Sequence, residues 1–417
     1  MPQPLTPDEA VVAIAAHARG ARVFVSAGPA EPLVLHEAWR RVPETAAELS
    51  FAGLFIPGVN RFDYTRLHSQ ARMELFMLSA DWREGFAAGR APLRPMHYSE
   101  ACAALVREGA PVGVFHVSAP DARGMCSFGL VADAPPLMLD RVGWKLALVN
   151  RAMPALAGAP GESLEAFDAI VEIDHPLAEL ADTPPSAAAT AIATHVAALV
   201  LDGDTIQTGV GKLPSAVTGA LAGKRRLRVH SGLIAASHVA LADAGAIADD
   251  AGAITGGMAV GDAAFYARAA REHRLRLAPV THTHAPFVLA GIDNLVAINA
   301  ALEIDLFGQI NAEFAGDAQI SGTGGLVDFI RGARASRGGR AIVMVQAEGR
   351  GASRIVPRLS NAVTVARADA PIVITEHGVV DLAPLALDAR ATAIIALAAP
   401  AHRDALAAAW AEMRATL

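Results

Sequence analysis

The chain has 417 residues, of which 53% are hydrophobic, so it can bury a large core and we expect two or three domains. Its net charge of −7 provides no basic surface for nucleic acid, so we expect no nucleic-acid partner. Its only cysteines, Cys102 and Cys126, have the spacing of neither a zinc site nor a disulfide framework, which indicates a reducing compartment and a cytoplasmic location.

The N-terminal segment Thr6-Pro7-Asp8-Glu9 predicts the start of a helix, with a threonine N-cap, a proline at the first helical position and a glutamate that completes a capping box. No positive segment followed by an apolar run precedes it, so we expect no signal peptide. Residues 183–201 carry no charge, but they open with Pro184-Pro185 and contain His195. This composition favours a linker followed by a helix, and we expect no membrane span.

Short apolar runs alternate with alanine-rich helical stretches along the chain, and this alternation predicts parallel α/β layers. The predicted buried strands are 23–25, 54–56, 112–117, 342–345 and 372–375. The segment Asp-Thr-Pro-Pro-Ser interrupts the pattern within residues 181–189. We therefore predict an N-terminal domain over residues 1–182 and a C-terminal domain over residues 183–417.

The two halves contain a faint repeat. Gly20 and Gly28 enclose a predicted strand in the first half, and Gly203 and Gly211 enclose one in the second, at the same spacing of eight residues. In each case a proline and a predicted helix follow. Any strand–turn–helix unit can show such spacing, so the pattern leaves internal duplication and coincidence equally open.

Two glycine-rich segments in the second half open predicted helices. Gly209-Val210-Gly211-Lys212-Leu213-Pro214 follows a predicted strand, 205–208, and leads into a helix from Ser215. Ser321-Gly322-Thr323-Gly324-Gly325 opens a helix from Leu326. Glycines there expose backbone N–H groups at a helix N-terminus, which suits an anion or a developing oxyanion. A tight turn or close packing could explain either segment, but two in one half favour a shared ligand site. Neither has the spacing of a P-loop or a dinucleotide fingerprint.

His282 and His284 are two residues apart, and we expect them to share one face of a strand. They could ligate a metal or form the polar end of a strand in a cleft; because no third ligand is evident nearby, we expect no metal. The sequence contains no Gly-x-Ser-x-Gly motif. This absence excludes a serine hydrolase of the α/β-hydrolase type.

Further motifs occur in order along most of the chain. In the first half they are Ser118-Ala119-Pro120-Asp121, Gly124, Cys126-Ser127, Gly129, Asn150, Met153-Pro154 and Asp174-His175-Pro176-Leu177. In the second half they are Gly209-Val210-Gly211, Pro214, Ala297-Ile298-Asn299, Glu303, Asp305, Gly324-Gly325, Asp328-Phe329-Ile330-Arg331-Gly332, Ser353-Arg354-Ile355-Val356-Pro357 and Thr375-Glu376-His377-Gly378-Val379. Together they resemble the acetyl-CoA hydrolase/transferase family, the class I CoA-transferase group that includes 4-hydroxybutyrate and succinyl-CoA:acetate CoA-transferases.

The resemblance implies two open α/β domains of the NagB/RpiA/CoA-transferase-like type, arranged as a homodimer or higher homo-oligomer. It implies an acyl-CoA of a small carboxylic acid as substrate, a carboxylic acid or water as second reactant, and no permanently bound cofactor. It also implies a mechanism in which a glutamate attacks the acyl-CoA and becomes a glutamyl-CoA thioester. That glutamate lies in a segment like His-Thr-Glu-Met, whereas this chain reads His230-Ser231-Gly232-Leu233. Gly232 therefore replaces the expected nucleophile.

A second departure concerns the asparagine that helps to bind the thioester oxygen in the family. This chain reads Thr283-His284-Ala285-Pro286, which assigns His284 to that position. The resemblance further assigns Gly209, Gly211, Gly324 and Gly325 to oxyanion or substrate binding. Arg331 and Arg354 are candidates for the CoA phosphates, because a guanidinium matches phosphate geometry, or for ordinary surface or domain-interface salt bridges.

Three readings of the function remain. In the first, water or the acceptor acid attacks directly in the space that Gly232 leaves, with His230 or His284 as base. In the second, a displaced carboxylate restores the CoA-transferase route, although Glu303 and Glu376 match family positions with other roles. In the third, the protein binds CoA or acyl-CoA without catalysis. We favour the first over the second, and both over the third; orientation of the loop would explain either histidine equally well.

Overall fold

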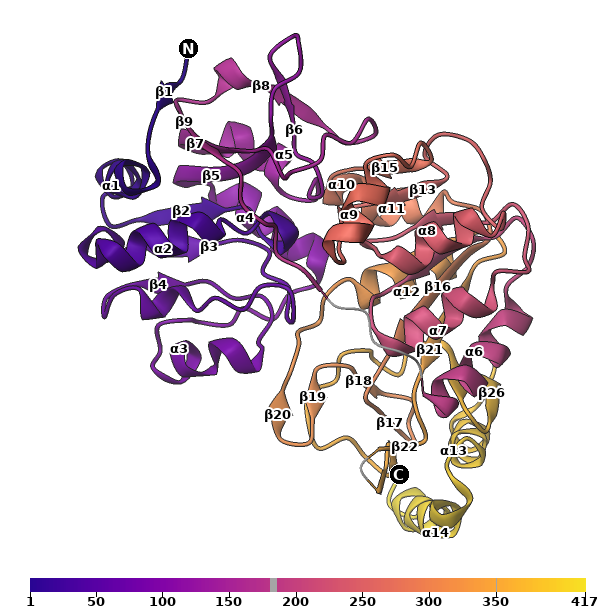
Figure 1. The fold of residues 1–417 in the computed structure, drawn as a ribbon. Helices are drawn as coiled ribbons and strands as arrows, with labels where there is room; N and C mark the ends of the chain where they lie inside the picture. Colours follow the sequence, from indigo (N-terminus) through magenta and orange to yellow (C-terminus); the bar gives the residue numbers. More distant parts are fainter. Residues whose placement is uncertain (181–185, 350) are drawn as a thin grey trace. The chain divides into compact units, whose positions relative to one another are not determined.

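The computed structural model describes residues 1–180, 186–349 and 351–417, and its chain forms two compact units (Figure 1). The first unit comprises Met1–Ala181, Gly232–Ala236 and Asp250–Thr283. The second comprises Asp182–Ser231, Ser237–Asp249 and His284–Leu417. The domain boundary predicted between residues 182 and 183 lies outside the described residues and stays a prediction. Two short segments from the second half of the chain belong to the first unit.

The first unit is built on a seven-stranded sheet in the order β1-β9-β7-β5-β2-β3-β4, in which every pairing is parallel. The winding reverses at β2, because β3 and β4 follow on one side and β5, β7 and β9 on the other. The strands are β1 (Gln3–Pro4), β2 (Arg22–Val25), β3 (Ser50–Ala52), β4 (Arg72–Met73), β5 (Ala110–Ser118), β7 (Val142–Asn150) and β9 (Ala169–Ile173). In open α/β sheets, ligands bind outside the carboxyl ends of the strands at such a reversal.

The helices of the first unit include α1, which begins as predicted. Thr6 caps it, its side chain and that of Glu9 form the capping box, and a proline occupies the first helical position. The helices are α1 (Pro7–Ala18), α2 (Leu33–Arg41), α3 (Arg83–Ala87), α4 (Tyr98–Glu108), α5 (Pro135–Met138), α9 (Ala263–Ala269) and α10 (Val280–Thr283). Two-stranded sheets are formed by β6 (Met125–Ser127) with β8 (Gly161–Ser163) and by β12 (Leu233–Ile234) with β14 (Met258–Ala259). The first unit also contains β13 (Ile254–Gly256), which pairs in parallel with β15 (Leu275–Leu277).

One predicted strand of the first unit is wrong. Residues 54–56 are buried but irregular, and β3 ends before them, at Ala52. The backbone N–H of Ile56 donates to the side chain of Asn60 instead of joining a strand ladder. A buried apolar run alone therefore did not distinguish a strand from a loop whose backbone is held by an asparagine.

In the second unit, six strands follow one another in the order β11-β10-β16-β21-β25-β26. All neighbours are parallel except the last pair. The strands are β10 (Thr205–Thr208), β11 (Arg228–His230), β16 (Leu295–Ala300), β21 (Arg340–Met344), β25 (Ile372–Thr375) and β26 (Gly378–Asp381). Here the winding reverses at β10. The position of β10 in this sheet therefore corresponds to that of β2 in the first.

This correspondence bears on the predicted repeat. Gly20 and Gly28 flank β2, Gly203 and Gly211 flank β10, and all four glycines have positive φ. Each strand lies where the winding of its sheet reverses, and a helix follows it. The repeat thus extends to the sheet topology, and internal duplication stays a prediction.

The remaining elements of the second unit are seven α-helices and three groups of short strands within the described residues. The helices are α6 (Ala187–Leu199), α7 (Lys212–Ala220), α8 (Ala236–Asp243), α11 (Pro286–Ala290), α12 (Leu326–Ala335), α13 (Leu387–Ala396) and α14 (Arg403–Arg414), with the first residue of α8 assigned to the first unit. The strands are β17 (Glu303–Asp305), β18 (Ile310–Asn311) and β24 (Ile355–Val356); β19 (Phe314–Ala315) and β20 (Ala318–Gln319); and β22 (Glu348–Gly349) and β23 (Ala352–Ser353). In Figure 1, α13 and α14 lie together at the yellow end of the chain. No helix in the described ranges is long and apolar enough to cross a membrane.

Candidate active site

The first predicted glycine segment forms the turn between β10 and α7. Helix α7 begins at Lys212, so the predicted start at Ser215 is three residues late; Pro214 lies within the first turn, where proline is tolerated. Gly211 is the N-cap, has φ 113° and provides no side-chain cap. A Cβ atom there would meet nothing within 4 Å, so the backbone conformation rather than lack of space requires glycine. The first N–H groups of α7 are therefore presented without a capping side chain.

The second glycine segment opens α12, which begins at Leu326 as predicted. Gly325 is its N-cap and again provides no side-chain cap, and the preceding Gly324 has φ 55°. A Cβ atom on Gly325 would lie 2.7 Å from Nε2 of His284 and 2.8 Å from its Cδ2. The structure thus brings two predicted site residues together: the imidazole of His284 lies against the N-terminus of α12.

The surroundings of His284 keep its ring neutral. The side chain is 3% exposed, and its ring centroid is 4.8 Å from that of Phe329. Burial, and then the nearby His230, lower the pKa of His284 to about 3. A neutral imidazole with so low a pKa is a weak base, but it can donate one N–H to a developing oxyanion. The environment favours hydrogen-bond donation over general-base catalysis for His284.

His230 ends β11 and is also buried. The hydroxyl of the following Ser231 donates to the backbone oxygen of Thr208 at 2.7 Å, which ties the end of β11 to the end of β10. The hydroxyl of Thr208 lies 2.8 Å from Nε2 of His238 on α8. His230 therefore belongs to a polar group at the carboxyl edge of β10 and β11. His238 was not among the predicted site residues, because no sequence motif surrounds it.

The winding reversal at β10 carries a pair of amides. Gln207 on β10 and Asn299 on β16 donate to each other, with N···O distances of 3.2 and 2.8 Å. Asn299 belongs to the motif Ala297-Ile298-Asn299. The reciprocal bonds lock the two central strands together next to the glycine turn after β10.

Gly232 belongs to the first unit, where its carbonyl accepts the N–H groups of Gly257 and Met258 at 3.0 and 3.1 Å. It is not among the glycines with positive φ, so an L-residue could adopt its backbone conformation. The family carboxylates noted in the sequence have structural partners in the second unit. Glu376 accepts the N–H of Ala347, and Glu303 accepts from the side chain of Asn311.

One further carboxylate packs close to Gly257. A Cβ atom on Gly257 would lie 3.2 Å from Cβ of Asp133 and 3.0 Å from the carbonyl oxygen of Gly232. Asp133 is 2% exposed, and Tyr98 donates to it at 2.5 Å. Burial raises the pKa of Asp133 to about 6, although the bond from Tyr98 opposes this. No sequence motif surrounds Asp133, so it was not among the predicted site residues.

The winding reversal of the first unit carries a second buried acid, Glu31. One carboxylate oxygen accepts from Asn60 at 3.0 Å, whereas the other is buried without a hydrogen-bond partner among the described residues. Burial raises the pKa of Glu31 to about 7. Nearby, His36 and Tyr64 are paired at 2.9 Å, and burial lowers the pKa of His36 to about 3.

The remaining predicted residues take other places. His282 lies in α10, where the N–H of Thr283 donates to the carbonyl of Pro279 in a helical turn. The prediction that His282 and His284 share one face of a strand is therefore wrong. Within the described ranges, no group of three or more His, Cys, Asp or Glu residues could hold a metal ion. Arg331 pairs with Asp369 at 3.1 Å, and the guanidinium of Arg354 lies over Gly349. A CoA contact for either arginine stays a prediction.

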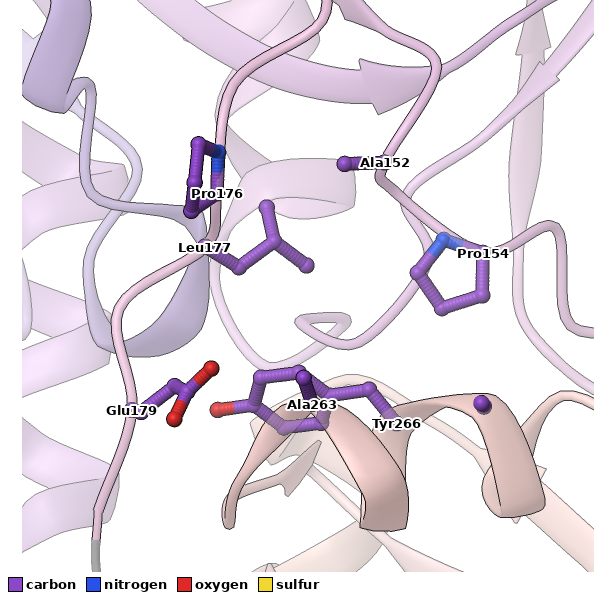
Figure 2. A pocket seen from close by; sticks show the side chains of 8 residues that line it. Ala152, Pro154, Pro176, Leu177, Glu179, Ala263 and Tyr266 are labelled. Carbon is purple, nitrogen blue, oxygen red and sulfur yellow. The ribbon is translucent and has the colours of Figure 1, made fainter.

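A cavity of ≈ 190 Å³ lies in the first unit, and none of the predicted catalytic, oxyanion-binding or CoA-binding residues lines it (Figure 2). Alanine, proline and leucine side chains form most of its wall. Glu179 and Tyr266 supply its polar groups, and Figure 2 shows their oxygens pointing toward each other. The Tyr266 hydroxyl donates to the backbone oxygen of Ala178 at 2.6 Å.

Comparison with known proteins gives one consistent result. Residues 261–410 match the model of the acetyl-CoA hydrolase/transferase C-terminal domain. The 4-hydroxybutyrate coenzyme A transferase of Clostridium kluyveri is 32% identical, and the alignment covers 96% of this chain and 96% of that protein. RipA from Yersinia pestis is 29% identical with a TM-score of 0.88, covering 99% of this chain and 98% of RipA. The 4-hydroxybutyrate CoA-transferase abfT-2 from Porphyromonas gingivalis is 27% identical with a TM-score of 0.80, covering 100% and 98%. The chain therefore belongs to the acetyl-CoA hydrolase/transferase family, as an enzyme with the α/β fold of its CoA-transferases.

Proposed function

We propose that this enzyme acts on the CoA thioester of a small carboxylic acid and that water or an acceptor acid attacks the thioester directly, without a glutamyl-CoA intermediate. The observation that carries the proposal is the segment His230-Ser231-Gly232-Leu233, in which the resemblance assigns Gly232 to the position of the family's nucleophile. Glycine has no functional group, so the covalent route has no carboxylate at that position. Either a hydrolase or a CoA-transferase-like enzyme can use direct attack.

The groups around α12 support this chemistry. His284 rests on Gly325 and is held neutral by burial, so one of its ring nitrogens carries a proton that can be donated. The glycine turn before α12 adds uncapped backbone N–H groups at the same place. Such donors stabilise the oxyanion that forms when a nucleophile adds to a thioester carbonyl, and losing one typically lowers kcat by about 10²- to 10³-fold.

The proposal assigns different roles to the two histidines. His284 donates to the oxyanion, because a pKa of about 3 makes it a poor acceptor for a proton from water. His230, at the end of β11, is the proposed base. From the resemblance to the family, we also propose that the protein is a homodimer or a higher homo-oligomer. From its cysteine usage, we propose that it is cytoplasmic.

A second candidate function is a true CoA-transferase with a displaced carboxylate, and Asp133 is the observation in its favour. Asp133 packs against Gly257, whose N–H bonds to Gly232. Its burial and its bond from Tyr98 argue against a role as nucleophile in this conformation, because a nucleophile must reach the substrate. An Asp133→Asn variant with unchanged acyl exchange would eliminate this candidate.

A panel of acyl-CoAs, incubated with and without carboxylic acids, tests the proposed function. Free thiol and acyl exchange are followed in parallel. Thiol release without an added acid identifies a hydrolase, and exchange that needs the acid identifies a transferase. If CoA binds but neither reaction occurs, the proposal is wrong.

A further inference from the structure

Two arginines of the second unit contact the ring of Phe307, and two more from other segments bond to the backbone beside them. Cζ of Arg358 lies 5.1 Å and Cζ of Arg367 5.9 Å from the centroid of the Phe307 ring, so both guanidinium groups contact this ring. Arg390, on α13, donates to the backbone oxygens of Arg367 and Phe307 at 2.8 and 3.4 Å. Arg334, on α12, donates to the backbone oxygens of residues 368, 369 and 370. We call Arg334, Arg358, Arg367 and Arg390 the arginine cluster.

The backbone bonds orient Arg334 and Arg390 without neutralising their charges. Burial, and then the charges of Arg367 and Arg334, lower the pKa of Arg390, which means that like charges face one another. Nε of Arg390 is buried with no acceptor among the described residues. Arg358 and Arg367 are exposed, so their guanidinium groups can meet a ligand.

The cluster lacks the carboxylates that usually balance arginines. Within the described part of the chain, none of its four members forms an ion pair, although acidic residues outnumber basic ones by 42 to 35. The carboxylates closest in sequence have other partners: Asp369 pairs with Arg331, and Asp388 pairs with Arg414. Asp305, two residues before Phe307, is buried and accepts backbone N–H groups. The cluster therefore retains an excess of positive charge.

We propose that the arginine cluster is a binding site for a phosphate-bearing ligand. Phosphate oxygens match the paired N–H groups of guanidinium, and a dianion gains more than a carboxylate from an excess of positive charge on neighbouring arginines. Contact with the Phe307 ring restricts two of the four guanidinium groups before a ligand binds. This reduces the conformational entropy that these side chains lose on binding. The phosphate belongs either to the nucleotide part of CoA or to a free anion. The proposal does not depend on the proposed reaction, because inorganic pyrophosphate alone tests it.

The test is calorimetric titration of the full chain with pyrophosphate at low ionic strength. Arg358→Ala and Arg367→Ala are the test variants, since neither side chain supplies the backbone bonds of the cluster. Each is expected to weaken binding about tenfold, and added salt is expected to weaken it in the wild type. Arg337→Ala is the matched control, because this arginine of the same unit is 85% exposed and pairs with Asp293. Thermal unfolding of every variant verifies the fold.

A parallel titration with CoA and with pantetheine distinguishes the two sources of phosphate. If the cluster holds the nucleotide of CoA, the two variants weaken CoA binding and leave pantetheine binding unchanged. If it holds a free anion, only pyrophosphate binding changes. The proposal is overturned if pyrophosphate shows no saturable binding to the wild type, or if Arg337→Ala weakens it as much as the cluster variants do.

Discussion

Replacing Gly325 by alanine tests the contact between His284 and the N-terminus of α12. The added Cβ would lie 2.7 Å from Nε2 and 2.8 Å from Cδ2 of His284, and 3.4 Å from a ring carbon of Phe329. The first two distances are too short for non-bonded atoms, so the imidazole must move. Because the ring is buried, we expect the shift to cost about 1–3 kcal/mol of unfolding free energy. Displacing the donor should also lower kcat about 10²-fold or more.

Two variants separate the clash from a general effect of alanine. Gly219→Ala, inside α7, meets nothing within 4 Å and should keep full activity while stabilising the helix by about 0.5–1 kcal/mol. In Gly325→Ala/His284→Ala the clash is removed, so the unfolding free energy should approach that of His284→Ala alone while kcat stays low. Urea unfolding and thioester turnover are the assays. Full activity and unchanged stability in Gly325→Ala would refute the assignment of His284 to this place.

Three further outcomes are expected. Burial raises the pKa of Glu31 from 4.5 to about 7, so its contribution to stability is present below pH 4.5 and is lost as pH rises through 7. Between pH 4.5 and pH 8, the unfolding free energy of Glu31→Gln should therefore rise by up to about 3 kcal/mol relative to that of the wild type. Thermal unfolding at both pH values checks this, and the 85% exposed Glu44→Gln should show no such trend. Gly211→Ala should lower the unfolding free energy, measured in urea, by about 1–3 kcal/mol, because the φ of Gly211 is 113°. Gly223→Ala should cause no such loss, because Gly223 has equally open surroundings but no positive φ. Equal losses in the two variants would contradict an explanation based on backbone conformation. His284→Asn, which restores the family's donor, should retain more activity than His284→Ala, and equal kcat values for the two would argue against a donor role.

Local features were predictable from the sequence. The capping box before α1, strands β10 and β25, and the glycine entrance to α12 depend on neighbouring residues, and all occur as expected. The predicted start of α7 at Ser215 is three residues late, because Pro214 lies inside the first turn, where its missing N–H costs nothing.

Features that depend on a choice between two local conformations, or on contacts between distant segments, were not predictable. The apolar run 54–56 is as hydrophobic as a strand, but Asn60 holds its backbone in a loop. His282 and His284 have a strand-like spacing, and a helical turn separates their environments. Nothing in the sequence indicates that residues 232–236 and 250–283 join the first unit. The arginine cluster is invisible for the same reason, since its members are spread over residues 334–390.

Gly232 remains the residue on which the proposed mechanism depends. Introducing the glutamate that the resemblance implies at this position tests that mechanism directly. Wild-type enzyme and Gly232→Glu are each incubated with an acyl-CoA, and a covalent enzyme–CoA thioester is sought by mass spectrometry after quenching. Direct attack predicts turnover without any adduct in the wild type, and an adduct that appears only in Gly232→Glu. An adduct on the wild-type enzyme would contradict the account, because another carboxylate would then be the nucleophile.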